Sequence, residues 1–168
     1  AWSTHYLAPL DRRIGDRRSA LGAKERVAGR RMARCSRVRT VMDFAPMGWG
    51  IGGAVGVALA HRGIPVVCIT GDGSFLMNGQ EITVAVEQKL PVVFLVLNDA
   101  ALGMVKHGQR LTGAERVGFE LPRVDFAAMA ATMGAQGIAI KTPADLIGLD
   151  VAAICARPGP TLLDVYID

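Results

Sequence analysis

Asp72 and Asn98 could together hold a magnesium ion, and each follows a run of apolar residues that is typical of a buried strand. Carboxylate and amide oxygens are hard donors that suit Mg²⁺, which completes its shell with phosphate oxygens and water. In a parallel sheet, ligands bind at the carboxyl ends of neighbouring strands. The pattern therefore predicts that a diphosphate is held through Mg²⁺ between these two strand ends.

The residues after Asp72 favour a phosphate at the same place. Gly73 and Ser74 lead toward a helix whose free backbone N–H groups would face a bound anion. Ser74 also has a simpler interpretation, as a cap of that helix. Two common nucleotide-binding patterns do not account for the segment. GxxxxGK[ST] is absent from the sequence, and the glycine-rich run 50–56 lacks the strand that must precede a GxGxxG loop.

The elements that must position these residues alternate between strand and helix patterns. Strands are predicted over residues 65–70, 91–97, 135–140 and 161–167. Helices are predicted over residues 47–60, 79–89, 125–133 and 143–156. Cap signals stand at Asn78, Asp125 and Thr142, and Pro143 occupies the first helical position after the last of these. The alternation predicts a three-layer α/β/α domain with a mainly parallel sheet.

The composition restricts the class of protein. The chain has 168 residues, 51% of them hydrophobic and 20% charged, which suits one globular domain. No apolar run reaches the roughly 18 residues of a membrane-spanning helix, so we expect no membrane partner. Cys35, Cys68 and Cys155 are far apart and form no CxxC pair. We therefore expect reduced thiols and a cytoplasmic location, with neither a zinc site nor a disulfide framework.

The positive charge of the chain is concentrated in one segment. Residues 11–40 contain ten Arg and one Lys against three acidic residues, whereas the remainder carries a net negative charge. This segment has no sustained hydrophobic period, and we interpret it as a solvated loop or a disordered insertion. An arm for nucleic acid or an anionic surface is the functional alternative. We expect no nucleic-acid partner, because no aromatic residues that could stack on bases are interleaved with the arginines.

Four segments, in order, resemble one enzyme family. GDGSFLMN, with 24 residues between Gly73 and Asn98, resembles the thiamine-diphosphate motif. PMGWGIGGAVGVALA, NDAALGMV and GPTLLDVYID resemble further segments of acetolactate synthases and related decarboxylases. The resemblance covers roughly residues 42–168. On these residues the chain is identified as similar to the C-terminal thiamine-diphosphate-binding domain of acetolactate synthase-like enzymes, with residues 41–168 forming that domain.

The resemblance implies a set of binding residues. The side chains of Asp72 and Asn98 and the carbonyl of Ala100 would bind Mg²⁺. The residues that would contact thiamine diphosphate lie at the same strand ends and in the glycine-rich segment upstream; they are Ala45, Met47, Gly71, Gly73, Ser74, Asn98, Leu102 and Gly103.

Two of these residues would act on the thiamine end of the cofactor. Met47 would support its bent conformation, and the carbonyl of Ala45 would accept a hydrogen bond from its amino group. The simpler interpretation of Met47 is a core residue. His107 is interpreted as a solvated helix residue without a catalytic role.

The resemblance also implies that a partner is needed. In this family the glutamate that activates the cofactor comes from a pyrimidine-binding domain, which does not fit within this sequence. We therefore expect no catalytic residue in this chain, inactivity of the chain in isolation, and a homo- or hetero-oligomer with a pyrimidine-binding domain or subunit. AWSTHYL resembles the helix that follows the first strand of such domains, so residues 1–40 are expected to hold part of that helix and the Arg-rich loop, without the first strand.

The implied reaction is loss of CO₂ from a 2-oxo acid, followed by protonation or by transfer to a second carbonyl. Gly108 stands where acetolactate synthases have a Trp that lines the acceptor pocket. This difference favours another 2-oxo acid decarboxylase or carboligase. Two alternatives remain open: the small subunit of a split 2-oxo acid decarboxylase, and a non-catalytic regulatory or interaction module that uses the Arg-rich arm.

Overall fold

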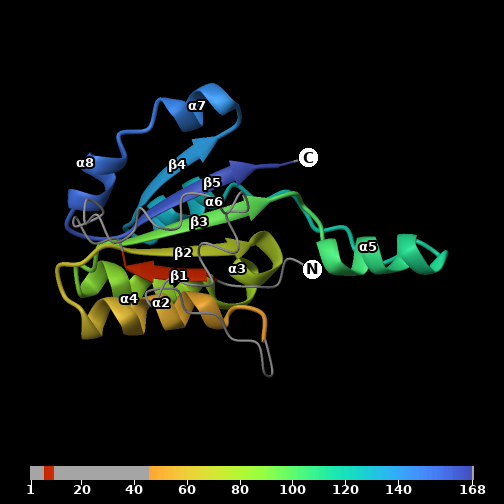
Figure 1. Cartoon of the computed structure of the whole chain (residues 1–168), viewed down its shortest axis with the longest axis horizontal. Coiled ribbons are helices and arrows are strands. Elements are labelled where there is room, and N and C mark those ends of the chain that lie inside the picture. The colour runs from red at the N-terminus through yellow and green to blue at the C-terminus, as the bar shows by residue number, and fades with distance from the viewer. Residues whose placement is uncertain (1–5, 10–45, 168) are drawn as a thin grey trace, which may run out of the picture.

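The computed structural model describes residues 6–9 and 46–167, and within them it contains one sheet of five strands. The strands are β1 (Tyr6–Pro9), β2 (Val66–Gly71), β3 (Val92–Asn98), β4 (Gln136–Ile140) and β5 (Thr161–Tyr166). Their order is β1-β2-β3-β5-β4 (Figure 1). β2, β3, β5 and β4 run parallel, and β1 runs antiparallel to β2. The predicted α/β class with a mainly parallel sheet is confirmed.

The predicted N-terminal helix is wrong at Tyr6 and Leu7. Both residues belong to β1, where Tyr6 pairs with Ile69 and Leu7 pairs with Cys68. The outer edge of β2 would otherwise present a row of unpaired backbone N–H and C=O groups, and β1 satisfies them. The interpretation of residues 11–40 as a loop, and the predicted role of Ala45, lie outside the described residues.

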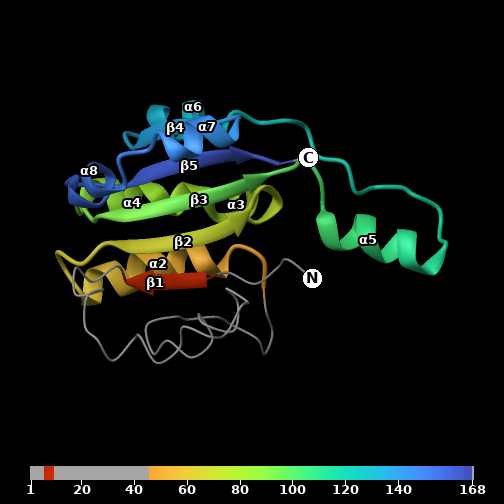
Figure 2. The same ribbon diagram turned by 45° about the horizontal axis from the view of Figure 1, so that its top comes forward.

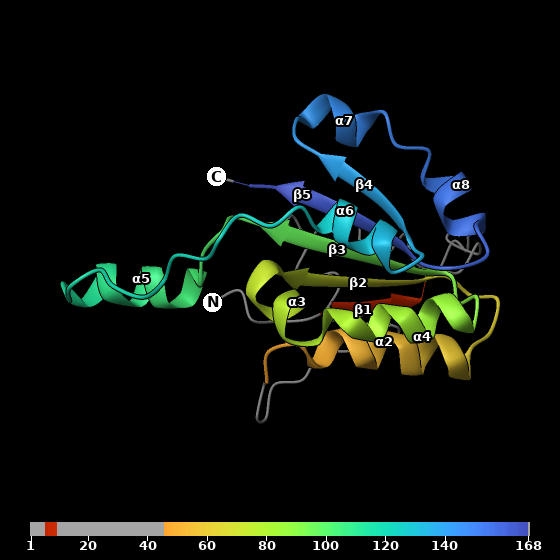
Figure 3. The same ribbon diagram turned by 180° about the vertical axis from the view of Figure 1, so that it is seen from behind.

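Helices cover both faces of the sheet. They are α2 (Trp49–Ala60), α3 (Asp72–Asn78), the 3₁₀ helix η2 (Gly79–Glu81), α4 (Ile82–Glu87), α5 (Gly103–Thr112), α6 (Phe126–Thr132), α7 (Pro143–Ile147) and α8 (Val151–Ala156). α2, α3, α4 and α6 pack on one face (Figure 3). α8 packs on the opposite face, and α7 lies beside β4. No helix in the described parts of the chain is long and apolar enough to span a membrane.

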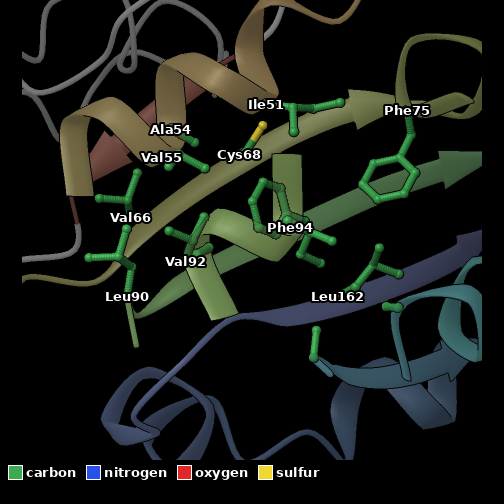
Figure 4. Close-up of a cluster of buried hydrophobic side chains, with 14 of the residues drawn as sticks. Ile51, Ala54, Val55, Val66, Cys68, Phe75, Leu90, Val92, Phe94 and Leu162 are labelled. Atoms are coloured by element: carbon green, nitrogen blue, oxygen red, sulfur yellow. The ribbon is translucent and has the colours of Figure 1, made fainter. Parts of the chain in front are cut away.

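The larger hydrophobic core lies between the sheet and the helices α2, α3, α4 and α6. Alternate residues of the strands, such as Cys68 and Phe94, point into it (Figure 4). Phe75 of α3 joins the core with its ring edge-to-face on Phe94 and Phe126, at centroid distances of 6.5 and 5.4 Å. The helix that begins at Asp72 is therefore fixed to the core by a residue three positions later.

Two predicted helices are divided differently in the structure. Asn78 occupies the N-cap position of η2, which begins at Gly79 as predicted, but its side chain makes no capping hydrogen bond. Asn78 is also the last residue of α3, a helix that the sequence patterns did not separate from the one after it. The predicted helix over residues 143–156 is two helices, with Gly148 as the C-cap of the first. The other two caps are confirmed: Asp125 accepts from the Ala128 N–H at 2.8 Å, and Thr142 forms a capping box with Asp145.

α5 projects from the body of the molecule beside the carboxyl ends of the parallel strands (Figure 2). None of its residues is buried. His107 lies in this helix and is exposed, as predicted. The segment after α5 returns along the start of the helix, where the Leu102 N–H donates to the Phe119 carbonyl at 2.7 Å.

Candidate magnesium and diphosphate site

The register of the sheet brings the two predicted side-chain metal ligands to adjacent strand ends. β2 and β3 are parallel neighbours with Gly71 opposite Leu97. Asp72 directly follows β2 and Asn98 ends β3, so the two residues occupy corresponding positions at the carboxyl edge of the sheet. The carboxyl ends of these neighbouring strands lie side by side in Figure 1. The crossover between the strands consists of α3, η2 and α4. The predicted neighbourhood of the two strand ends is confirmed.

Asp72 is the first residue of α3, and its side chain is 4% exposed. Its Oδ1 accepts a hydrogen bond from the Gly73 N–H at 2.7 Å. Its Oδ2 is buried and has no hydrogen-bond partner among the described residues. Burial raises the pKa of the carboxyl group and the charge of Asp99 raises it further, whereas backbone N–H groups of Gly73, Ala101 and Ala100 lower it. Among the described residues, only backbone N–H groups thus favour the charged form of this carboxylate.

Asn98 ends β3 and is 1% exposed. Its Nδ2 donates two hydrogen bonds, one to the Val124 carbonyl at 3.0 Å and one to Asp164 Oδ1 at 2.9 Å. Its Oδ1 is buried and, like Asp72 Oδ2, has no partner within the part of the chain that the structure describes. Because the amide nitrogen faces these two acceptors, the amide oxygen points away from both of them.

These two oxygens fit a divalent cation of the hard class. A buried acceptor without a donor costs about 1–3 kcal/mol, and here two such acceptors follow neighbouring strands. A carboxylate and an amide oxygen match the chemistry of Mg²⁺ ligands, and a cation would also offset the repulsion between Asp72 and Asp99. Over the described ranges, no group of three His, Cys, Asp or Glu side chains gathers as a metal site. The predicted ligand set differs from such a group, because it includes an amide oxygen and a backbone carbonyl.

The carbonyl of Ala100, the third predicted ligand, already accepts a hydrogen bond. The Leu121 N–H donates to it at 2.8 Å, and a carbonyl oxygen has a second lone pair for a metal. Ala100 has a φ of 52°, a left-handed conformation that non-glycine residues seldom adopt and that frequently marks functional sites. The role of Ala100 as a ligand stays a prediction.

Three residues that were expected around the cofactor lie together. A Cβ atom on Gly73 would lie 2.9 Å from Leu102 Cδ2 and 3.2 Å from Met47 Cε. The absence of a side chain at Gly73 thus permits Met47 and Leu102 to approach the start of α3. Gly48, next to Met47, has a φ of 87°, and a Cβ there would lie 2.8 Å from Asn78 Cγ. The chain entering α2 therefore needs glycine at this turn.

The remaining predicted residues are placed as follows. Gly71 is the last residue of β2, and Gly103 is the first residue of α5. Ser74 is 5% exposed and occupies the first turn of α3. Its interpretation as a cap is wrong, because the N-cap position is Gly71. Whether these residues contact a diphosphate stays a prediction.

Asp164 was not singled out from the sequence. It lies in β5, is fully buried, and accepts hydrogen bonds from Asn98 Nδ2 through Oδ1 and from the Phe126 N–H through Oδ2. Burial raises the pKa of its carboxyl group, while the hydrogen bonds from Asn98, Phe126 and Ala127 lower it. A charged residue inside an otherwise apolar terminal strand, TLLDVY, is the signal that could have identified it.

Comparison with known proteins gives the family. The family model described as thiamine pyrophosphate enzyme, C-terminal TPP binding domain matches residues 23–165. The chain belongs to this family. The predicted resemblance to acetolactate synthase-like enzymes is also confirmed, because relatives of this chain are named as acetolactate synthases. The matched span begins inside the Arg-rich segment, and the predicted domain boundary at residues 40 and 41 stays a prediction.

Two relatives are acetolactate synthase large subunits by name. IlvB2 of Mycobacterium tuberculosis, assigned as such a subunit, is 42% identical over 139 residues, which are 80% of this chain and 24% of the relative. The acetolactate synthase large subunit of Haemophilus influenzae is 40% identical over 124 residues, 73% of this chain and 22% of the relative. The chain therefore spans about a quarter of the length of the relatives that it matches.

A decarboxylase structure shares the fold. The crystal structure of benzoylformate decarboxylase from Polynucleobacter necessarius has a TM-score of 0.67 and 30% sequence identity to this chain. The match covers 73% of this chain and 24% of that protein.

Proposed function

We propose that this chain binds thiamine diphosphate through Mg²⁺ and forms the diphosphate-binding part of the active site of a 2-oxo acid decarboxylase or carboligase. One observation carries the proposal: Asp72 Oδ2 and Asn98 Oδ1 are buried oxygens at adjacent strand ends with no hydrogen-bond partner among residues 6–9 and 46–167, in a chain of the thiamine pyrophosphate enzyme family. Substrate and partner are inferred from the relatives, which are named as acetolactate synthases and decarboxylases.

The described residues have separate roles in this proposal. Asp72 and Asn98 hold the metal through their side chains, with the carbonyl of Ala100 as a third ligand. Gly71, Gly73, Ser74, Leu102 and Gly103 border the diphosphate. Met47, which approaches Gly73 through its Cε, supports the thiamine end.

The cofactor, when bound, supplies the sink for the electrons left behind when CO₂ leaves a 2-oxo acid. Asp72 and Asn98 do not take part in bond breaking; they fix the position of the diphosphate. The proton-transfer group that activates the cofactor would come from a pyrimidine-binding domain, carried by a partner chain or by a longer form of this one. A homo- or hetero-oligomer and a cytoplasmic location are part of the proposal.

The test combines binding and turnover. Calorimetry on the chain with a pyrimidine-binding partner is expected to show thiamine diphosphate binding that requires Mg²⁺, and Asp72→Ala is expected to weaken it at least tenfold. Release of CO₂ from pyruvate and from benzoylformate then reports the activity, which is expected only when both proteins are present. Absence of cofactor binding in the presence of the partner would refute the proposal.

A further inference from the structure

We propose that Asp164 is a positioning residue for the metal site: its carboxylate holds the amide of Asn98 in the one orientation that leaves Oδ1 free for Mg²⁺. This inference rests on the proposed function. It concerns a residue two strand positions before Tyr166, the residue of β5 that pairs with Asn98 in the sheet.

An asparagine amide has a donor end and an acceptor end of nearly equal size. Asn98 could therefore present either end to a metal unless its surroundings distinguish them. Here the nitrogen faces two acceptors, the carbonyl of Val124 at 3.0 Å and Oδ1 of Asp164 at 2.9 Å. Turning the amide by 180° would put its oxygen against both acceptors. The orientation that exposes the oxygen is thus selected by repulsion as well as by attraction.

Asp164 can do this because it is itself held at its other oxygen. Oδ2 accepts from the backbone N–H of Phe126, the first residue of α6, at 3.0 Å. The Val124 carbonyl belongs to the same entry segment of α6. Both acceptors on the Asn98 amide are therefore tied to the start of α6. The pair of side chains is buried, with Asp164 at 0% and Asn98 at 1% exposure, and Val124 is half-buried.

The two donors that face Asp164 explain why a carboxylate is needed there. An ionised carboxylate accepts at both oxygens, whereas an amide of the same shape accepts at one end and donates at the other. Burying a carboxylate is costly unless it is hydrogen-bonded, and a structural role alone could be filled by an apolar residue at lower cost. A carboxylate at position 164 can accept from Asn98 and from Phe126 at the same time, and this keeps Asn98 in its metal-binding orientation.

The competing explanation is that Asp164 only stabilises the start of α6. Asp125 provides a matched control, because it caps the same helix by accepting from the Ala128 N–H at 2.8 Å but is not one of the two acceptors on the Asn98 amide. Asp164→Asn and Asp125→Ala should both lower the melting temperature of the metal-free chain. The two explanations differ in what they predict for the metal.

The experiment is a titration of the chain and its pyrimidine-binding partner with Mg²⁺ at saturating thiamine diphosphate. Calorimetry monitors the binding at a temperature well below the melting temperature of each variant. In Asp164→Asn the new amide satisfies the Phe126 N–H with its oxygen and turns its NH₂ toward Asn98, which must flip. The Mg²⁺ concentration at half-saturation is expected to rise by about 10–100-fold, the usual effect of losing a hydrogen-bond partner of a metal ligand. Asp125→Ala is expected to change it by less than about twofold. Equal Mg²⁺ dependence in Asp164→Asn and the unsubstituted chain would overturn the inference.

A second measurement needs no substitution. In the unsubstituted, metal-free chain, the side-chain NH₂ of Asn98 should exchange with solvent far more slowly than that of Gln80, which is exposed, when both are followed by ¹⁵N NMR. Exchange as fast as that of Gln80 would mean that the two acceptors do not hold the amide.

If the unsubstituted chain with its partner binds no Mg²⁺ and thiamine diphosphate, the proposed function fails and the inference fails with it. If the unsubstituted chain binds both and Asp164→Asn needs no more Mg²⁺ than it does, the proposed function stands and only the inference fails.

Discussion

At the scale of single residues, the candidate site is defined by two buried oxygen atoms that the described residues leave unpaired. Asp72 and Asn98 each use one polar atom for hydrogen bonds, and each has one buried oxygen that meets no donor in the described part of the chain. Proteins rarely keep such groups, because each costs about 1–3 kcal/mol of stability. In the proposed function these oxygens are the structural cost of a preformed metal site, and binding of Mg²⁺ should recover it.

Cys68 gives a prediction that is independent of the metal site. It is fully buried, its thiol donates to the Gly50 carbonyl at 3.3 Å, and burial raises its pKa from 9.0 to about 12. Because the thiolate is the reactive form, iodoacetamide at pH 8 should label Cys155, which is half-buried, well before Cys68. Mass spectrometry of the labelled peptides measures the two rates, and equal rates would contradict the burial of Cys68.

The same thiol makes stability depend on alkaline pH. The unfolded chain ionises Cys68 near pH 9, whereas the folded chain does so near pH 12, so the contribution of the thiol is complete below pH 9 and falls as the pH rises toward 12. The free energy of unfolding should decrease less steeply between pH 9 and pH 11 in Cys68→Ala than in the unsubstituted chain. Urea denaturation at several pH values measures both slopes. The stability that Cys68→Ala loses through the cavity left by the sulfur atom is the same at every pH, so it does not affect the comparison of slopes.

The sequence could predict Asp72 and Asn98 but not Asp164. The first two stand directly after apolar runs, and consecutive parallel strands place them at one edge whatever the details of packing. The contact between Asn98 and Asp164 depends on β5 lying beside β3, with Leu97 opposite Val165. The two strands are separated along the chain by α5, α6, β4, α7 and α8, and no local pattern specifies that pairing.

At the scale of elements, strands were predictable where apolar β-branched runs ended at Pro or Gly. Boundaries failed where tertiary packing overrode local signals. α3 and α4 form separate helices because the Phe75 ring turns into the core and needs Gly79 beside it, where a Cβ would lie 2.7 Å from Phe75 Cδ1. The periodicity of residues 79–89 carries no trace of this contact. Gly148 similarly ends α7 inside a segment that reads as one continuous helix.

Packing of α6 on β4 depends on Gly137. A Cβ there would overlap the Ala127 carbonyl, with the Ala127 carbonyl carbon 2.6 Å and the Ala127 Cα 2.8 Å away. These are backbone atoms that cannot rotate aside, so Gly137→Ala is expected to lower the free energy of unfolding by about 1–3 kcal/mol or more. Urea denaturation measures the change.

Gly56→Ala is the matched control for that substitution. Gly56 lies in α2, is exposed, and a Cβ there would meet nothing within 4 Å. Since glycine inside a helix is less favourable than alanine by about 0.5–1 kcal/mol, this variant should be more stable than the unsubstituted chain. Similar losses in the two variants would show that α6 does not pack on β4 as closely as described.

At the scale of the whole molecule, charge is divided between segments with different expected roles. The ten arginines of residues 11–40 carry the positive charge, while the rest of the chain is net negative. Replacing all ten by Gln is expected to leave Mg²⁺-dependent binding of thiamine diphosphate unchanged within about twofold, since no predicted ligand lies in this segment. DNA binding measured from 50 to 200 mM salt tests the alternative that this segment is an arm for nucleic acid. A steep salt-dependent affinity that disappears in the Gln variant would favour an interaction arm.

In the proposed function, Asp72 and Asn98 hold a metal that in turn holds the diphosphate. Its most direct test is the affinity for thiamine diphosphate, measured by calorimetry with Mg²⁺ and again with EDTA, in the unsubstituted chain and in Asp72→Ala, each with the pyrimidine-binding partner. We expect strong binding only for the unsubstituted chain with Mg²⁺, and equally weak binding in the other three titrations. Binding that is as tight with EDTA as with Mg²⁺, or that survives Asp72→Ala, would contradict it.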